Sequence, residues 1–143
     1  MTESIVPAIA MLKKVKSGNV PTTYRHTKKE WVEFPGGKKY FLKSSWERRY
    51  ANYLEILKKG NAINDWQYEV DTFWFDKIKR GVRSYTPDFK IFFSDGSIEY
   101  HEVKGWMDGR SKTKIKRMKK YHPSVKLIII GKSEMRSIGG AGL

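Results

Sequence analysis

Two short motifs in the middle of the chain carry side chains that could do chemistry together. The first is Pro87-Asp88, and the second is EVKG at residues 102–105. Residues two apart on a strand share a face, so Glu102 and Lys104 would point the same way. Mg²⁺ prefers oxygen ligands, commonly one or two carboxylates, with water and substrate phosphate completing its shell. The two motifs therefore indicate a metal-assisted site that acts on phosphate.

The turn that connects the two strands decides whether Asp88 joins this group. A two-residue turn would place Asp88 opposite Val103, on the wrong face. A three-residue turn would place Asp88 directly across from Glu102, with Gly96 in the left-handed position that glycine tolerates best. We expect the three-residue turn, because it gathers two carboxylates and an ammonium group on one face.

Each residue of this group has an assigned role in the expected site. Asp88, Glu102 and the backbone carbonyl of Val103 would hold the ion, which activates water and neutralises charge on a phosphodiester. Lys104 would orient or deprotonate the attacking water, or stabilise the pentacovalent state. Alone, Asp88 also fits a turn residue after proline, and Glu102 and Lys104 also fit a solvated strand face.

Glu47 is a further carboxylate candidate and lies at the start of a predicted helix. Ser44 suits the N-cap, Glu47 completes a capping-box pattern, and Gly60 ends the helix. Two roles stay open for Glu47: the capping-box partner of Ser44, or a ligand for a second metal ion or a metal-bound water. Its shared face with Ala51 and Leu54 favours an inward direction.

Hydrophobic patterning predicts the elements that must position these residues. The order from residue 44 onward is helix, three strands, helix, strand. The last strand is separated from its predecessor by enough chain for a parallel crossover. We therefore predict an α/β (α+β) single domain with a mixed central sheet. The expected elements are a short helix over 5–16, a hairpin over 31–42, a helix over 44–60, strands over 63–75, 82–93 and 97–104, a helix over 110–121 and a strand over 125–130.

Composition bounds the class of protein. The 143 residues carry 29 Lys and Arg against 15 Asp and Glu, a formal net charge of +14, and no cysteine. Without cysteine there is no disulfide, thiol catalysis or Cys-ligated zinc. No apolar run reaches the roughly 18 residues of a membrane span, and the N-terminus lacks a secretory pattern. We expect a cytoplasmic protein with a nucleic acid, rather than a membrane, as its partner.

The helix over 110–121 is the first candidate for DNA contact. Nine Lys and Arg and no acidic residue lie between residues 109 and 133. A lysine-rich solvated helix is the alternative, but its position just after Lys104 favours phosphate contact. The candidate DNA-binding residues are Lys112, Lys114, Lys116, Arg117, Lys119, Lys120, Arg48, Arg49, Lys38 and Lys39.

Proline-aspartate followed by Glu-x-Lys, after a helix that carries a glutamate, resembles the PD-(D/E)xK nuclease superfamily. Within it, the chain is most similar to the phage endonuclease I family of Holliday-junction resolvases. The likeness covers roughly residues 43–131. The segments that carry it are SSWERRYANYLE at 44–55, YTPDF at 85–89, EVKGW at 102–106 and KKYHPSVKLIII at 119–130.

This resemblance implies a restriction-endonuclease-like αβββαβ core over 43–131. Residues 1–42 would form an N-terminal arm and hairpin for dimerisation or DNA contact, and 132–143 a flexible tail. It implies the catalytic residues Glu47, Asp88, Glu102 and Lys104, with Mg²⁺ or Mn²⁺ as cofactor.

The same resemblance implies a homodimer that nicks branched DNA such as a four-way junction. A protein of phage origin would act in the cytoplasm of an infected bacterial host. Two alternatives stay open at this stage. One is another PD-(D/E)xK nuclease for nicking, repair or transposon-end cleavage, and the other is a DNA-binding module without catalysis.

Overall fold

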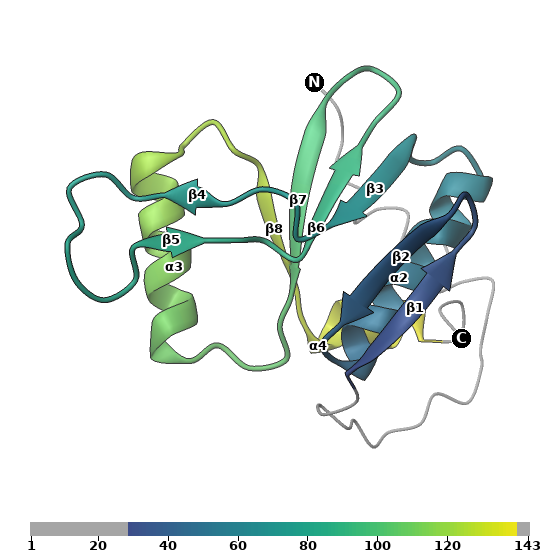
Figure 1. Ribbon diagram of the computed structural model, residues 1–143, viewed down its shortest axis with the longest axis horizontal. Coiled ribbons are helices and arrows are strands. Elements are labelled where there is room, and N and C mark those ends of the chain that lie inside the picture. Colours follow the sequence, from purple (N-terminus) through teal and green to yellow (C-terminus); the bar gives the residue numbers. More distant parts are fainter. Residues whose placement is uncertain (1–28, 140–143) are drawn as a thin grey trace.

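A four-stranded mixed sheet runs through the centre of the protein (Figure 1). The structure is a computed structural model that describes residues 29–139. The strand order is β3-β6-β7-β8, antiparallel except for the parallel pair β7 and β8. The predicted mixed sheet in an α+β domain is confirmed. The sheet strands are β3 (Asp65–Tyr68), β6 (Phe89–Phe92), β7 (Ile98–Val103) and β8 (Leu127–Ile130).

Local sequence signals set the ends of the two long helices. At the start of α2, Ser44 Oγ accepts the backbone N–H of Glu47 at 3.1 Å. At the start of α3, the Asp108 carboxylate accepts the backbone N–H of Ser111 at 2.7 Å. Proline cannot continue a helix, and α3 ends two residues before Pro123. The described helices are α2 (Ser45–Lys59), α3 (Gly109–Tyr121) and α4 (Lys132–Ile138).

Two hydrophobic clusters hold these elements together. In the larger one, Tyr50 and Leu54 of α2 pack with Trp66 and Phe89 of the sheet, all fully buried. The second cluster is separate and joins α3 to a small two-stranded ribbon. Its buried members are Phe75, Val82, Tyr85 and Met118.

The N-terminal hairpin forms as predicted. Its turn contains Gly36 and Gly37, both with positive φ (86° and 81°), which glycine adopts without steric cost. Figure 1 shows the hairpin beside α2, on the side of the molecule away from α3. Its strands are β1 (Glu30–Phe34) and β2 (Lys38–Leu42), paired in antiparallel register.

Two of the predicted long strands are broken, which corrects the expectation of continuous strands over 63–75 and 82–93. The first strand stops where Glu69 adopts a φ of 47°, and the second is interrupted at Pro87, which has no N–H to donate. The outer segments of these two predicted strands pair with each other and not with the central sheet. They form the ribbon strands β4 (Phe73–Trp74) and β5 (Ser84–Tyr85).

The expectation of a flexible tail over 132–143 is wrong for its first part. Residues Lys132–Ile138 form α4, because Met135 and Ile138 bury their side chains in the larger cluster. The predicted helix over 5–16 lies outside the described residues. Within residues 29–139, no helix combines the length and apolar character that a membrane span requires.

Candidate active site

Asp88 and Glu102 face each other across β6 and β7. The strands pair Phe89 with His101, which places the preceding Asp88 opposite Glu102. Gly96, in the turn between them, has a φ of +88°. The three-residue turn and the register predicted from the sequence are therefore confirmed.

Each carboxylate of this pair uses one oxygen in the protein. Glu102 Oε1 accepts the backbone N–H of Asp88 at 3.2 Å and the hydroxyl of Tyr85 at 2.7 Å. Asp88 Oδ2 accepts the backbone N–H of Val103 at 2.9 Å. Within the described chain, Asp88 Oδ1 and Glu102 Oε2 accept no hydrogen bond. These bonds fix both side chains and leave one oxygen of each open.

The electrostatics of the pair favour a cation. Burial raises the pKa of Asp88 well above its ordinary value, and the negative charges of Glu102 and Glu47 raise it further. Burial also raises the pKa of Glu102, although the Tyr85 hydroxyl, the Asp88 N–H and the Lys104 ammonium act to lower it. A bound divalent cation would stabilise the ionised forms of both carboxylates.

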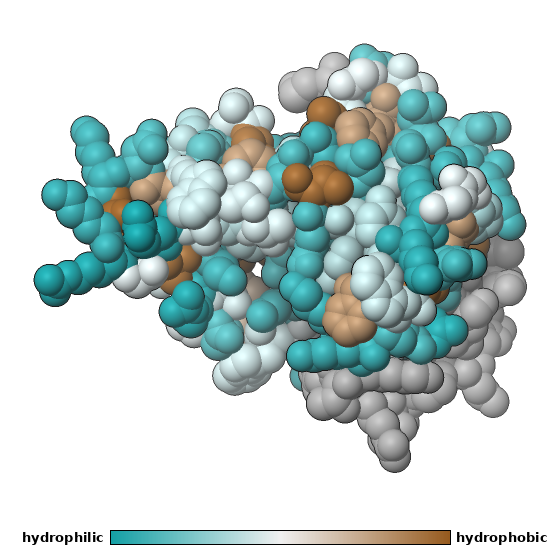
Figure 2. All heavy atoms as spheres, viewed as in Figure 1, coloured by the Kyte–Doolittle hydropathy of each residue, from teal (hydrophilic) through white to brown (hydrophobic). Residues whose placement is uncertain are grey.

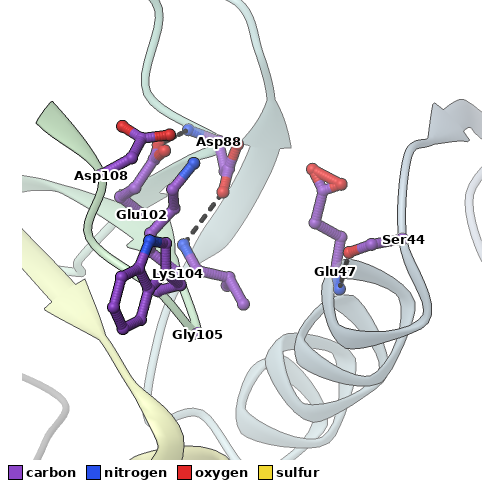
Figure 3. Close-up of a pocket in the computed structure, with 9 residues that line it drawn as sticks. Ser44, Glu47, Asp88, Glu102, Lys104, Gly105 and Asp108 are labelled. Carbon is purple, nitrogen blue, oxygen red and sulfur yellow. Dashed lines mark hydrogen bonds between the residues drawn. The ribbon is translucent and has the colours of Figure 1, made fainter. Parts of the chain in front are cut away.

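A cavity of about 300 Å³ opens beside the pair (Figure 3). The four expected catalytic residues and Val103 all line it, so the structure brings together side chains from α2, β6 and β7. Trp106, at its rim, is 74% exposed. The lining residues are Ser44, Glu47, Asp88, Glu102, Val103, Lys104, Gly105, Trp106 and Asp108.

Glu47 lies at the start of α2 and also lines the cavity. Its carboxylate accepts the N–H of Lys43 at 3.1 Å, one residue before the N-cap, and the hydroxyl of Tyr68 at 2.8 Å. Burial raises the pKa of Glu47, and the Tyr68 hydroxyl acts to lower it. Figure 3 shows Glu47 across the cavity from Asp88 and Glu102. It therefore supports the start of α2 and also adds negative charge to the cavity.

The donor set fits a metal ion that takes few protein ligands. Among residues 29–139, no group of three or more His, Asp or Glu side chains is close enough to form a metal cage. Mg²⁺ does not require one, since it usually binds one or two carboxylates and keeps several waters. The open oxygens of Asp88 and Glu102, on the wall of one cavity, fit that requirement.

Sequence analysis missed the residues that support the carboxylates. Tyr85 and Tyr68 each donate a hydroxyl to a site carboxylate, and Glu69 ends β3 with its N–H bonded to the carbonyl of Asp88 at 2.8 Å. Glu69 also pairs with Lys43 at 2.7 Å at the edge of the site. Tyr68 lies 21 residues from Glu47, and Tyr85 lies 17 residues from Glu102, so no local spacing rule connects either hydroxyl with the carboxylate that it supports.

Gly105 lets the chain turn closely over α2 just after Lys104. A Cβ at this position would lie 2.8 Å from Cζ3 of the Trp46 ring, which is buried. Glycine is therefore required there by packing. The contact holds the end of the EVKG motif against the first turn of α2, which carries Glu47.

The candidate DNA-binding residues of α3 fall into two groups. Lys112, Lys116, Lys119 and Lys120 are exposed. Lys114 and Arg117 are half-buried. The Lys114 ammonium lies 5.8 Å from the centre of the Tyr85 ring, near Glu102, and Arg117 donates to the carbonyl of Val82.

The candidates outside α3 are partly engaged within the protein. Lys38 donates to the Asp65 carboxylate and the Trp66 carbonyl, and Arg48 pairs with Glu30 at 2.7 Å. These contacts reduce their availability to phosphate. Lys39 is exposed, and Arg49 is half-buried.

The fold and the cavity together define a small α+β protein with a carboxylate pair and a lysine at the ends of two adjacent strands. The chain belongs to the family described as "Protein of unknown function (DUF1064)", whose model matches residues 32–137. The match spans β1 to α4 and so includes every residue of the cavity. No curated protein and no solved structure gives a significant match.

Proposed function

We propose that this protein is a metal-dependent DNA endonuclease of the PD-(D/E)xK type with a restriction-endonuclease-like core. The observation that carries the proposal is the placement of Asp88 opposite Glu102, with Lys104 beside them in one cavity. Glu47 of α2 lines the same cavity from the opposite side, and a chance pair of strand carboxylates would not account for this lysine and this third carboxylate.

The residues divide the work of phosphodiester hydrolysis among them. Asp88 and Glu102, with the carbonyl of Val103, would hold Mg²⁺ or Mn²⁺, which supplies Lewis-acid stabilisation and activates water. Lys104 places a positive charge beside the attacked phosphate and orients or deprotonates the nucleophile. Tyr85 holds Glu102 in its binding orientation through the 2.7 Å bond.

The substrate we propose is branched DNA, cut by a homodimer as in Holliday-junction resolution. The net charge of +14 and the exposed lysines of α3 support a nucleic acid substrate. Branch preference and the paired action of two copies rest on the resemblance of the sequence motifs to phage resolvases.

Cleavage of defined DNA tests this proposal. A labelled four-way junction, a matched duplex and a single strand are incubated with the protein in Mg²⁺, Mn²⁺ or EDTA. We expect metal-dependent nicking of the junction, abolished in Lys104→Ala with binding retained. The matched control is Lys132→Ala, an exposed lysine outside the cavity, which should cleave normally.

Three results would contradict parts of the proposal. Binding without cleavage in either metal would indicate a DNA-binding module. Equal cleavage of duplex and junction would remove the resolvase assignment and leave another nuclease of the same type. Full activity of Lys104→Ala would show that the proposed cavity is not the active site.

A further inference from the structure

Most of the net positive charge of the protein lies at one end of the molecule. We call this end the basic lobe and define it as the β4–β5 ribbon, residues 73–85, together with α3, residues 109–121. Eleven basic side chains and one acidic side chain, Asp76, give the lobe a net charge of +10. Figure 1 shows the ribbon lying across α3, and Figure 2 shows hydrophilic side chains projecting from this end.

The loop of the ribbon adds charges that the sequence analysis did not assign to DNA contact. We call its four basic residues the ribbon tip. All four are exposed, and none lies within ion-pair distance of a carboxylate of the described chain. Lys77 and Gly81 shape the loop through positive φ values of 71° and 73°. The ribbon tip consists of Lys77, Lys79, Arg80 and Arg83.

Packing holds the ribbon against α3. Arg117 of α3 donates to the carbonyl of Val82, and His122 Nε2 lies 2.8 Å from the carbonyl of Trp74. The small core around Met118 fills the space between them. The ribbon tip and the exposed lysines of α3 therefore belong to one structural unit.

The inner end of this lobe reaches the carboxylate pair. Tyr85, the last residue of β5, donates to Glu102, and Lys114 of α3 lies over the Tyr85 ring. A polyanion bound along the lobe would thus continue toward the cavity. Repeated phosphates of a duplex match this extended arrangement of charges better than a single small anion does.

We propose that the ribbon tip is a second nucleic-acid contact, which together with α3 binds the phosphodiester backbone of a duplex arm beside the cavity. The proposal rests on the proposed function in taking DNA as the polyanion. The contact requires no metal, because the lysines and arginines supply the charge themselves. It contributes affinity without sequence preference.

The salt dependence of binding tests this contact separately from catalysis. Binding of a fluorescein-labelled duplex is measured by anisotropy in EDTA over a series of NaCl concentrations. The tip variant is Lys79→Gln/Arg80→Gln/Arg83→Gln. Each lost phosphate contact should lower the log–log salt slope by about 0.9, or about 2.7 for three.

A charge-matched variant and a smaller variant serve as controls. Lys59→Gln/Lys132→Gln/Arg136→Gln removes the same charge from exposed positions on α2 and α4, outside the lobe, and should keep most of the wild-type slope. The double variant Lys79→Gln/Arg80→Gln should lower the salt slope by about 1.8. It replaces the triple variant if circular dichroism shows that the triple variant is unfolded.

The outcomes separate this inference from the proposed function. The ribbon contact is overturned if the tip variant keeps the wild-type salt slope, or if the charge-matched variant loses as much slope as the tip variant. It is also overturned if wild type binds anionic phosphatidylserine vesicles but not the duplex. Specific loss in the tip variant supports it even if wild type cuts nothing in Mg²⁺. Cleavage by wild type with normal binding by the tip variant leaves the nuclease and removes the ribbon contact.

Discussion

Glu102 accepts a hydrogen bond at 3.2 Å from the backbone of Asp88, the residue opposite it that immediately precedes β6. The two carboxylates are thus held together by the sheet itself, although their charges repel. The arrangement follows from the strand register, which the turn ending at Gly96 sets. The cost in stability and the proposed cation binding can both be measured.

Asp88→Asn should stabilise the metal-free protein at neutral pH. A folded-state pKa raised by burial and by Glu102 means that ionised Asp88 opposes folding. Its stabilising contribution is present below the unfolded pKa of about 3.9 and is lost as pH rises through the folded pKa. Urea unfolding in EDTA should show the free energy of unfolding falling as pH rises in wild type, and falling less in the variant. Asp76→Asn, an exposed acid, should show no such gain.

Divalent cations should stabilise wild type and not Asp88→Asn. An ion that binds only the folded protein adds about 2.7 kcal/mol at a concentration of 100 Kd. Thermal unfolding with Mg²⁺, Mn²⁺ or EDTA would measure this without any nucleic acid. An equal rise of Tm in both proteins would contradict a metal site at the carboxylate pair.

Tyr85→Phe should impair the site while leaving the strands in place. The hydroxyl bond stabilises ionised Glu102, so its loss should raise the Glu102 pKa and move the acid limb of the pH–rate profile to higher pH. Bonds to charged groups contribute about 1.5–3 kcal/mol. Tyr100→Phe, which removes a similar bond to Asp71 outside the cavity, should leave the profile unmoved.

Gly105→Ala should destabilise the protein by about 1–3 kcal/mol, because the added methyl group overlaps the Trp46 ring. Gly109→Ala provides the matched control. A Cβ at Gly109 meets nothing within 4 Å, so this change should be neutral or stabilising by up to about 1 kcal/mol. Equal urea midpoints for the two variants would argue against the close approach of Gly105 to the Trp46 ring.

Stability should fall as pH drops below about 6.5, because His101 resists protonation. Its Nε2 lies 3.0 Å from the Glu99 carboxylate and its Nδ1 2.6 Å from the Tyr50 hydroxyl. Burial lowers the folded pKa of His101 although Glu99 acts to raise it. Its contribution is therefore present above the unfolded pKa of about 6.5 and is lost as pH falls.

Urea unfolding between pH 8 and pH 5 tests this dependence, with a slope of up to about 1.4 kcal/mol per pH unit in the affected range. His101→Gln should flatten the slope, since no titrating ring remains. His122→Gln replaces a histidine that does not contact Glu99 or Tyr50, and this variant should keep the pH dependence of wild type. A slope that survives in His101→Gln would assign the effect to other groups.

Patterns within a few residues determined much of this site. Ser44 and Glu47 define a helix start through a hydrogen bond between residues three apart, which needs no distant segment of the chain. The turn ending at Gly96 sets the register, and the period of two in a strand then places Asp88, Glu102 and Lys104 on one face. These relationships need no distant partner, so they could be predicted from the sequence.

Contacts between distant segments decided the rest. Glu69 and Pro87 divert the outer strand segments into the ribbon, because those segments bury Phe75 and Val82 against Met118 of α3. This packing brings the Tyr85 hydroxyl to Glu102. It also places the ribbon tip on the same lobe as the charged helix.

The same distinction applies to the C-terminal segment and to Glu47. Lys132–Ile138 has little apolar pattern of its own, and it is helical because Met135 and Ile138 fill space in the main core. Glu47 faces the cavity because Tyr68, 21 residues away, donates to it. Sequence by itself determined which residues could act together, through local bonds and strand periodicity. The tertiary structure decided which side chains support them, since burial and long-range hydrogen bonds depend on the whole fold.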